Sequence, residues 1–409
     1  MQVYRYMHRV PLYSLLLLTS LVAPLAAQTA QWGDELPRQG TALDRMMLGA
    51  PRQLEPVDWP APPLLPPPKS IRAIYLNAWA FGSKHFYDLV RLADTTEINA
   101  FVIDVKDDTG YLTYPSKVPT AIAITANQQI RAPDVRERLA VLHAHGIFPI
   151  ARIVVAKDPL LASHKPAWSI HHADGGLWQD RKGHGWVDAY TDSVWVYAGD
   201  LGEEAVRMGF GELQFDYVRF PDEPRSLMAK AVYPGRKGKE TTRDGVVRNL
   251  RMLRNQLKPL GVPFTIDVFG MTASADVDMG IGQVWEDLVT TADVVLPMVY
   301  PSHYYGGFYE IVHPNSEPYE VVHRAIRDGM LRAAPLGKTA EIRPWLQAFT
   351  LGAPRYTGFH VKEQIRAVED LGLKSWVLWN ARSVYADDAF RPSPPRTARV
   401  AAVLPSHIH

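Results

Sequence analysis

The stretch Glu212-Leu-Gln-Phe-Asp-Tyr-Val-Arg-Phe-Pro221 begins as a short apolar run, ends in charged and aromatic residues, and precedes a longer polar loop. Seven other stretches have a similar form: Ile71–Trp79, Ala100–Asp107, Phe148–Ala156, Pro263–Met271, Val294–Pro301, Ile342–Phe349 and Lys374–Arg382. Helical patterns separate them: one beginning near Ser83, then Ala132–His145, Val187–Met208, Thr242–Leu260, Gly282–Ala292, Pro318–Met330 and Val361–Leu371. Strands and helices that alternate in this way predict an α/β fold, a (β/α)8 TIM barrel.

Loop lengths support the same fold. Connections from a helix to the next strand are short, such as Gly146 alone, whereas connections from a strand to the next helix are long, such as 108–131 and 157–186. A barrel whose carboxyl-terminal face carries the function shows this asymmetry. An open doubly wound sheet is the alternative. That fold would carry a glycine-rich phosphate turn after its first strand, and Asn77-Ala-Trp-Ala-Phe-Gly82 is not one.

The first 27 residues have the pattern of a signal peptide. Arg5, His8 and Arg9 make a basic start, Leu12–Leu25 is mostly apolar, and Ala26–Ala27 offers small residues for cleavage. The apolar run is short for a membrane span, although a retained anchor is the alternative. We therefore expect a secreted or periplasmic bacterial protein.

Proline marks the remaining boundaries. Eight prolines crowd residues 51–68, so we expect residues 28–70 to be a Pro-rich linker, with the barrel over 71–390. Pro392, Pro394 and Pro395 predict a flexible tail over 391–409.

The composition excludes several classes of partner and chemistry. Lys and Arg number 44 against 43 Asp and Glu, so the chain lacks the basic excess of proteins that bind nucleic acid or anionic membranes. We expect no membrane partner beyond the export signal. The absence of cysteine excludes disulfides, thiol catalysis and a lipoprotein-type anchor.

Two aspartates stand at the ends of neighbouring strands. Asp216 ends the fourth apolar run and Asp267 lies in the fifth, Phe264-Thr-Ile-Asp-Val-Phe269. Because adjacent parallel strands end side by side, we expect both carboxylates to converge in the barrel mouth. Two carboxylates flanking a cleft are the minimal equipment for hydrolysing a glycosidic bond. A structural role for Asp267 is the alternative.

Further residues are candidates for binding the substrate. Arg219 follows Asp216 by three positions and would hold that carboxylate ionised, although a purely structural ion pair is the alternative. Asp104 and Lys106 share one side of the second strand, and we expect them to point inward unless they only satisfy charge in the barrel interior. Aromatic and polar residues near strand ends suit sugar stacking and hydrogen bonding: Tyr300, His303, Trp345, Gln347, Trp379 and Asn380.

Other chemistries fit the sequence less well. The first strand lacks the His-x-His of a metal hydrolase, His143 and His145 lie at a helix end, and His171–His172 lie in a long loop. No Gly-x-Ser-x-Gly elbow, phosphate-binding loop or dinucleotide fingerprint occurs. We therefore expect no metal and no cofactor.

Five motifs occur in order: Val102-Ile-Asp-Val-Lys-Asp107, Phe215-Asp-Tyr-Val-Arg-Phe-Pro221, Asp267-Val-Phe-Gly270, Met298-Val-Tyr-Pro301 and Arg343-Pro-Trp-Leu-Gln347. Together they resemble a bacterial family known as the putative glycoside hydrolase domain, over about residues 70–385. The resemblance implies a barrel of the glycoside hydrolase superfamily that acts on a polysaccharide outside the cytoplasm, and it supports Asp216 as the matching carboxylate on the fourth strand.

These observations predict a hydrolase that cleaves glycosidic bonds of a polysaccharide or oligosaccharide. We expect Asp216 to be the nucleophile or stabilising carboxylate and Asp267 to be the general acid/base, with Glu223 and Glu286 as substitutes for the acid. The alternative function is a carbohydrate-binding barrel without turnover.

Overall fold

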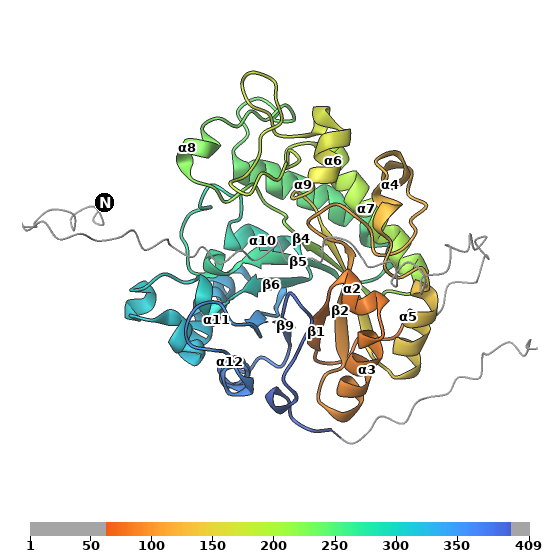
Figure 1. Ribbon diagram of the computed structural model, residues 1–409. Coiled ribbons are helices and arrows are strands. Elements are labelled where there is room, and N and C mark those ends of the chain that lie inside the picture. The colour runs from red at the N-terminus through yellow and green to blue at the C-terminus, as the bar shows by residue number, and fades with distance from the viewer. Residues whose placement is uncertain (1–62, 394–409) are drawn as a thin grey trace, which may run out of the picture. The chain divides into compact units, whose positions relative to one another are not determined.

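The protein is represented by a computed structural model that describes residues 63–393 (Figure 1). The predicted signal peptide, most of the predicted linker and most of the predicted tail lie outside these residues. Within residues 63–393, no helix combines the length and the apolar character that crossing a bilayer requires.

One closed parallel sheet forms the centre of the fold. Its strands are β1 (Arg72–Leu76), β2 (Ala100–Lys106), β3 (Phe148–Val154), β4 (Glu212–Asp216), β5 (Phe264–Phe269), β6 (Val294–Met298), β7 (Glu341–Ile342), β8 (Trp345–Gln347) and β9 (Trp376–Trp379). Each strand pairs in parallel with its neighbours, β9 pairs with β1, and β5 pairs with β6. Because β7 and β8 both pair with β6 and are separated by Arg343 and Pro344, they form two halves of one barrel strand. The predicted eight-stranded barrel is confirmed.

Helices surround the sheet, as Figure 1 shows. Those that connect successive barrel strands are α3 (His85–Thr95), α5 (Val135–Ala144), α7 (Asp192–Met208), α9 (Thr242–Leu257), α10 (Trp285–Thr291), α11 (Pro318–Ala333) and α12 (Gly358–Asp370). Four shorter helices, which the sequence did not indicate, lie within the strand-to-helix connections: α2 (Ala78–Gly82), α4 (Pro119–Ala123), α6 (Pro159–His164) and α8 (Arg225–Met228).

Alternation along the strands divides the core into two layers. Alternate residues such as Ala73, Val102, Ile150, Leu296 and Val377 pack together inside the barrel. The intervening residues pack outward against the helices as a second apolar cluster. Residues at inward positions near the carboxyl ends of the strands therefore share one barrel mouth.

Candidate active site

The centre of the site is a single arginine bonded to two carboxylates and close to a third. Arg152 lies inward on β3, where it pairs in register with Asp104 of β2 and Gln214 of β4. Its Nη1 donates to Asp104 Oδ1 at 2.5 Å, and its Nε donates to Asp216 Oδ2 at 3.2 Å. Arg152 Nη2 also donates to Asp216 Oδ2, and Nε lies 3.7 Å from Asp267 Oδ2. One buried guanidinium thus fixes carboxylates from three strands.

Asp216 reaches the pocket from the end of β4. Its Oδ2 is held by Arg152, and its Oδ1 accepts a hydrogen bond from the backbone N–H of Tyr217 at 2.5 Å. Tyr217 has a φ of 52°, a left-handed conformation that is rare for a bulky residue. Strained backbone of this kind is concentrated at functional sites, where surrounding structure compensates its cost.

Asp267 lies deeper in the barrel than Asp216. Its Oδ1 accepts hydrogen bonds from Gln214 Nε2 at 2.8 Å and Trp345 Nε1 at 2.6 Å, while its Oδ2 has no hydrogen-bond partner among the described residues. Burial, and then the charge of Asp216, raise the pKa of the Asp267 carboxyl well above its usual value. Asp267 therefore holds a proton under conditions in which an exposed aspartate would not.

Asp104 is the third carboxylate of the group. The Tyr75 hydroxyl donates to its Oδ2, opposite the bond from Arg152 to its Oδ1. Burial raises the pKa of Asp104 to about 7, although the neighbouring Arg152 acts in the opposite direction. Tyr75 in turn stacks on Trp379, with ring centroids 4.0 Å apart, so an aromatic wall adjoins the charged group.

A pocket of about 210 Å³ opens above this network. It is lined by Arg152, Asp216, Tyr217, Arg219, Phe269, Gly270, Met271, Met298, Tyr300, His303, Tyr304, Trp345 and Trp379. Among the described residues that line it, Asp216 is the only acid. Burial lowers the pKa of His303, which favours the neutral form of its imidazole. A cavity with aromatic walls and few polar groups suits a ligand with both apolar and hydroxylated faces, such as a sugar ring.

The structure brings together most, but not all, of the residues predicted for substrate binding. Arg219, Tyr300, His303, Trp345 and Trp379 line the pocket. Asp104 lies beneath the pocket, where it contacts Arg152 and Tyr75. That any of these residues binds substrate remains a prediction.

Three other side chains lie outside the pocket. The strand register shifts between Asp104 and Lys106, so Lys106 lies beside outward-facing Ile153 and its ammonium pairs with Asp158 at 2.5 Å. The expectation that Lys106 points inward is therefore wrong.

Gln347 and Asn380 hold loops rather than facing the cavity. Gln347 Oε1 accepts from the backbone N–H of Ser302 at 3.0 Å, and Asn380 Nδ2 donates to the carbonyl of Ala348 at 2.7 Å. Gln347 Nε2 also donates to the carbonyl of Phe349 at 3.0 Å and to the side chain of Asn315 at 3.3 Å, so both side chains bond to the loops around the barrel mouth.

The expected ion pair between Arg219 and Asp216 does not form. Arg152 takes that place, and Arg219 Nη1 donates instead to the carbonyl of Phe220 at 3.1 Å. The two substitute acids also lie elsewhere, because Glu223 pairs with Arg181 and Glu286 with Arg332. Sequence reasoning missed Arg152, although a lone charged residue at an inward position of an apolar strand was a usable signal.

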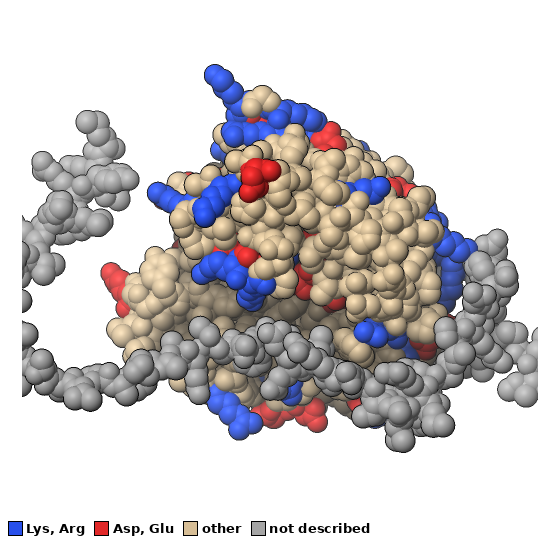
Figure 2. Space-filling model, turned by 45° about the horizontal axis from the view of Figure 1, so that its top comes forward, with Lys and Arg blue, Asp and Glu red and all other residues tan. Residues whose placement is uncertain are grey.

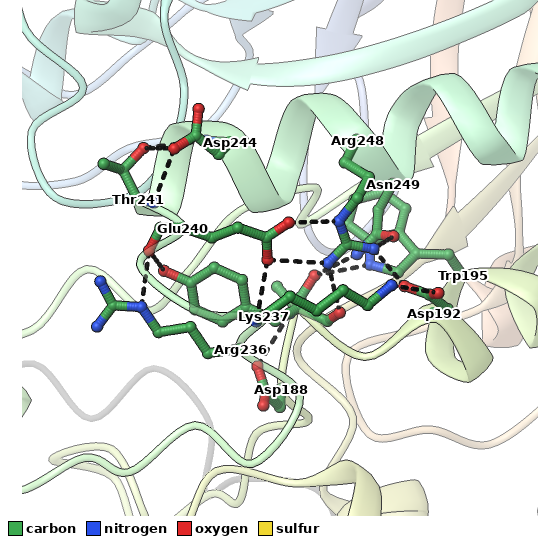
Figure 3. A network of polar contacts seen from close by, with 12 residues as sticks. Asp188, Asp192, Trp195, Arg236, Lys237, Glu240, Thr241, Asp244, Arg248 and Asn249 are labelled. Carbon is green, nitrogen blue, oxygen red and sulfur yellow. Dashed lines mark hydrogen bonds and ion pairs between the residues drawn. The ribbon is translucent and has the colours of Figure 1, made fainter.

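A second polar network fastens the long loop between β4 and α9. Figure 3 shows the side chain of Arg248, on α9, between Glu240 and Asp192. Lys237 also pairs with Asp192 at 2.8 Å, and the backbone N–H of Gly235 donates to Asp188 at 2.7 Å. These bonds join the end of the loop to α7, to Asp188 in the segment before α7, and to α9. They anchor the segment whose beginning carries Tyr217 and Arg219.

Within residues 63–393, no group of three or more His, Cys, Asp or Glu side chains is arranged to hold a metal ion. On the face shown in Figure 2, Lys and Arg occur in several separate groups with Asp and Glu among them, and much of the surface is neutral.

The fold and the acidic site together define a barrel of the glycoside hydrolase type. The chain belongs to the family described as "Putative glycosyl hydrolase domain", whose model matches residues 73–385. No curated protein matches the chain.

Several solved structures are similar to this chain, and they differ in sequence identity, coverage and TM-score. A hypothetical protein from Ruminiclostridium thermocellum is 35% identical, with 45% of this chain and 92% of that chain covered and a TM-score of 0.41. The PgaB (BpsB) glycoside hydrolase domain from Bordetella bronchiseptica is 11% identical, with 77% and 95% covered and a TM-score of 0.55. The α-galactosidase TtGalA from Thermus thermophilus is 15% identical, with 80% and 60% covered and a TM-score of 0.44. At such low identity, the likeness to the Bordetella domain shows the fold alone.

Proposed function

We propose that this protein hydrolyses glycosidic bonds of an extracytoplasmic polysaccharide, with Asp216 and Asp267 as the catalytic pair. The observation that carries the proposal is the pair itself, since two carboxylates from adjacent strands meet at Arg152 beneath an aromatic-walled pocket. Membership of the glycosyl hydrolase domain family supports the reaction class. The export pattern in residues 1–27 supports a substrate outside the cytoplasm.

The two carboxylates are assigned different roles. Asp216 is the pocket-lining carboxylate with hydrogen bonds from Arg152 and Tyr217, which suits the ion that attacks or stabilises the sugar carbon. Asp267 has a raised pKa and an unbonded Oδ2, which suits the group that gives a proton to the leaving oxygen. When Asp216 attacks the sugar, its carboxylate loses its negative charge. Because that charge helps to keep Asp267 protonated, its loss would favour release of the proton from Asp267.

Oxygens of both residues approach one nitrogen, at 3.2 and 3.7 Å. That proximity favours the carboxylate spacing of roughly 5 Å found in retaining enzymes over the wider spacing of inverting ones. We therefore propose a retaining mechanism, with a covalent glycosyl intermediate on Asp216.

One observation favours the alternative of a carbohydrate-binding barrel without turnover. Asp267 is only 1% exposed and does not line the pocket, so a substrate must displace neighbouring side chains to reach it.

The test is a screen of wild type and Asp216→Asn against bacterial cell-wall and exopolysaccharide fractions, with released reducing ends and glycan binding measured in parallel. The hydrolase predicts that wild type releases ends from at least one fraction and that Asp216→Asn binds the same fraction without releasing them. If wild type binds a fraction but releases no more ends than the variant, the binding barrel is the correct function.

A further inference from the structure

Arg219 is a buried cation in the pocket wall that lacks a carboxylate partner. Its side chain lines the cavity, the residue is 9% exposed, and its Nε has no hydrogen-bond partner among the described residues. Its only protein hydrogen bond within residues 63–393 runs from Nη1 to the carbonyl of Phe220 at 3.1 Å. The positive charge of Arg219 is therefore not neutralised by an ion pair within the described chain.

Three other cations on β3 or in the loop that follows it, Arg152, Lys157 and Arg181, are paired. Arg152 has Asp104 and Asp216, Lys157 Nζ lies 2.6 Å from Asp108, and Arg181 Nε lies 2.6 Å from Glu223. Arg219 is far more buried than Arg181, whose side chain is 68% exposed. A buried charge has the greater need of a partner.

Aromatic rings compensate part of the free-energy cost of burying the charge of Arg219. The guanidinium carbon of Arg219 lies 4.9 Å from the ring centroid of Tyr217 and 5.7 Å from those of Trp186 and Phe269. Such cation–π contacts stabilise the charge of Arg219. They do not replace the hydrogen bonds that the guanidinium N–H groups donate in their own plane to an oxygen. Nη1 donates to Phe220, whereas Nε is buried without a hydrogen-bond partner and no bond from Nη2 to a described residue occurs, so an oxyanion that reached the Nε–Nη2 edge would satisfy both nitrogens. That planar edge matches the two oxygens of a carboxylate in bidentate geometry.

We propose that the glycan bound in this pocket is acidic, and that an oxyanion substituent on one of its sugars pairs with the Nε–Nη2 edge of Arg219. A uronic acid carboxylate is the best geometric match, and a sulfate ester offers the same chemistry. The inference rests on the proposed function of the pocket as a glycan site. It assigns Arg219 as the residue that selects charged over neutral sugars.

The experiment measures binding in the Asp216→Asn background, so that its result does not depend on turnover. Uronate-containing polysaccharides are compared with the same polymers after chemical reduction of their carboxyl groups, and a sulfated glycan provides a third arm. We expect at least one acidic polymer to bind, and carboxyl reduction to weaken that binding by about 30-fold or more, the usual effect of removing one member of a buried charged pair. Preferential binding of the sulfated arm would assign the oxyanion as sulfate.

Variants localise the effect. Arg219→Gln should lose the preference for the acidic polymer and bind the reduced polymer as before, whereas Arg219→Lys should retain part of the preference. Arg181→Gln removes the same charge from an exposed, paired position and should leave the preference intact. Thermal unfolding midpoints identify any variant that fails to fold, and Arg219→Lys then carries the comparison.

Two results would overturn the inference. One is equal binding of acidic and neutral polymers by the parent protein, and the other is an Arg219→Gln variant that keeps the preference. Either result can coexist with hydrolysis of a neutral glycan, which would leave the proposed function intact. Conversely, acidic binding that depends on Arg219 without release of reducing ends would support the inference and contradict the hydrolase.

Discussion

Asp216 Oδ2 and Asp267 Oδ2 approach the same atom, Nε of Arg152, at 3.2 and 3.7 Å. Since Arg152 also binds Asp104, its single charge faces three buried carboxylates. This excess of acid explains why burial and mutual repulsion outweigh the arginine at Asp267, whose pKa is raised. One ionised and one protonated carboxyl group is the arrangement that glycoside hydrolysis requires.

Replacing Arg152 with methionine should abolish activity and destabilise the fold. Removing one partner of a buried ionic group costs about 3–5 kcal/mol, because it leaves uncompensated charge. The matched control is Arg343→Met, since Arg343 pairs with Glu212 at 2.7 Å inside the same barrel but away from the pocket lining. Under conditions where both variants are folded, we expect kcat to fall only for Arg152→Met. Equal loss of kcat in both would show that Arg152 acts only through stability.

Asp104 should make stability depend on pH. Burial raises its pKa from 3.8 to about 7, so between these values the folded state binds a proton that the unfolded state releases. The stabilisation is fully present below pH 4 and is lost as pH rises through 7. Asp104→Asn cannot titrate, so its stability relative to wild type should increase from pH 5 to pH 8, by about 1 kcal/mol or more. Urea unfolding at several pH values measures this difference, and a constant difference across the range would contradict the assigned pKa.

Gly270 lines the pocket at a position that leaves no room for a side chain. A Cβ there would lie 2.2 Å from the carbonyl oxygen of Met298 and 3.2 Å from the Tyr304 hydroxyl. We expect Gly270→Ala to cost about 1–3 kcal/mol in the free energy of unfolding and to weaken glycan binding, because β6 must move. At Gly176, the nearest atom to an added Cβ is 3.4 Å away, so Gly176→Ala should leave both quantities unchanged. Urea unfolding and glycan titration test both variants. If Gly270→Ala has the wild-type free energy of unfolding and the wild-type glycan affinity, this prediction is wrong.

The sequence was sufficient to predict the barrel, because each strand appears as a separate apolar run between helical patterns. It also indicated Asp216 and Asp267, since acids in apolar strands need a physical reason. It could not show the register irregularity after Asp104 that turns Lys106 outward. Nor could spacing distinguish Arg219 from Arg152 as the partner of Asp216, because contacts between strands depend on three-dimensional register. The division of the seventh barrel strand at Arg343 and Pro344 likewise required coordinates.

The roles assigned to the two acids can be separated by chemical rescue with azide, once the cleaved sugar is known and can be supplied as an aryl glycoside, whose leaving group departs without a general acid. Azide is a small anion that replaces a missing carboxylate nucleophile, or attacks a glycosyl intermediate when the acid/base is missing. For a retaining enzyme, the first case yields a glycosyl azide of opposite anomeric configuration to the substrate, and the second yields one of the same configuration.

The most direct measurement is therefore the configuration of the glycosyl azide formed by Asp216→Ala and by Asp267→Ala, determined by proton NMR. We expect an inverted product from Asp216→Ala and a retained product from Asp267→Ala. Full activity of Asp216→Ala without azide, or a retained product from that variant, would contradict the assignment of Asp216 as the nucleophile.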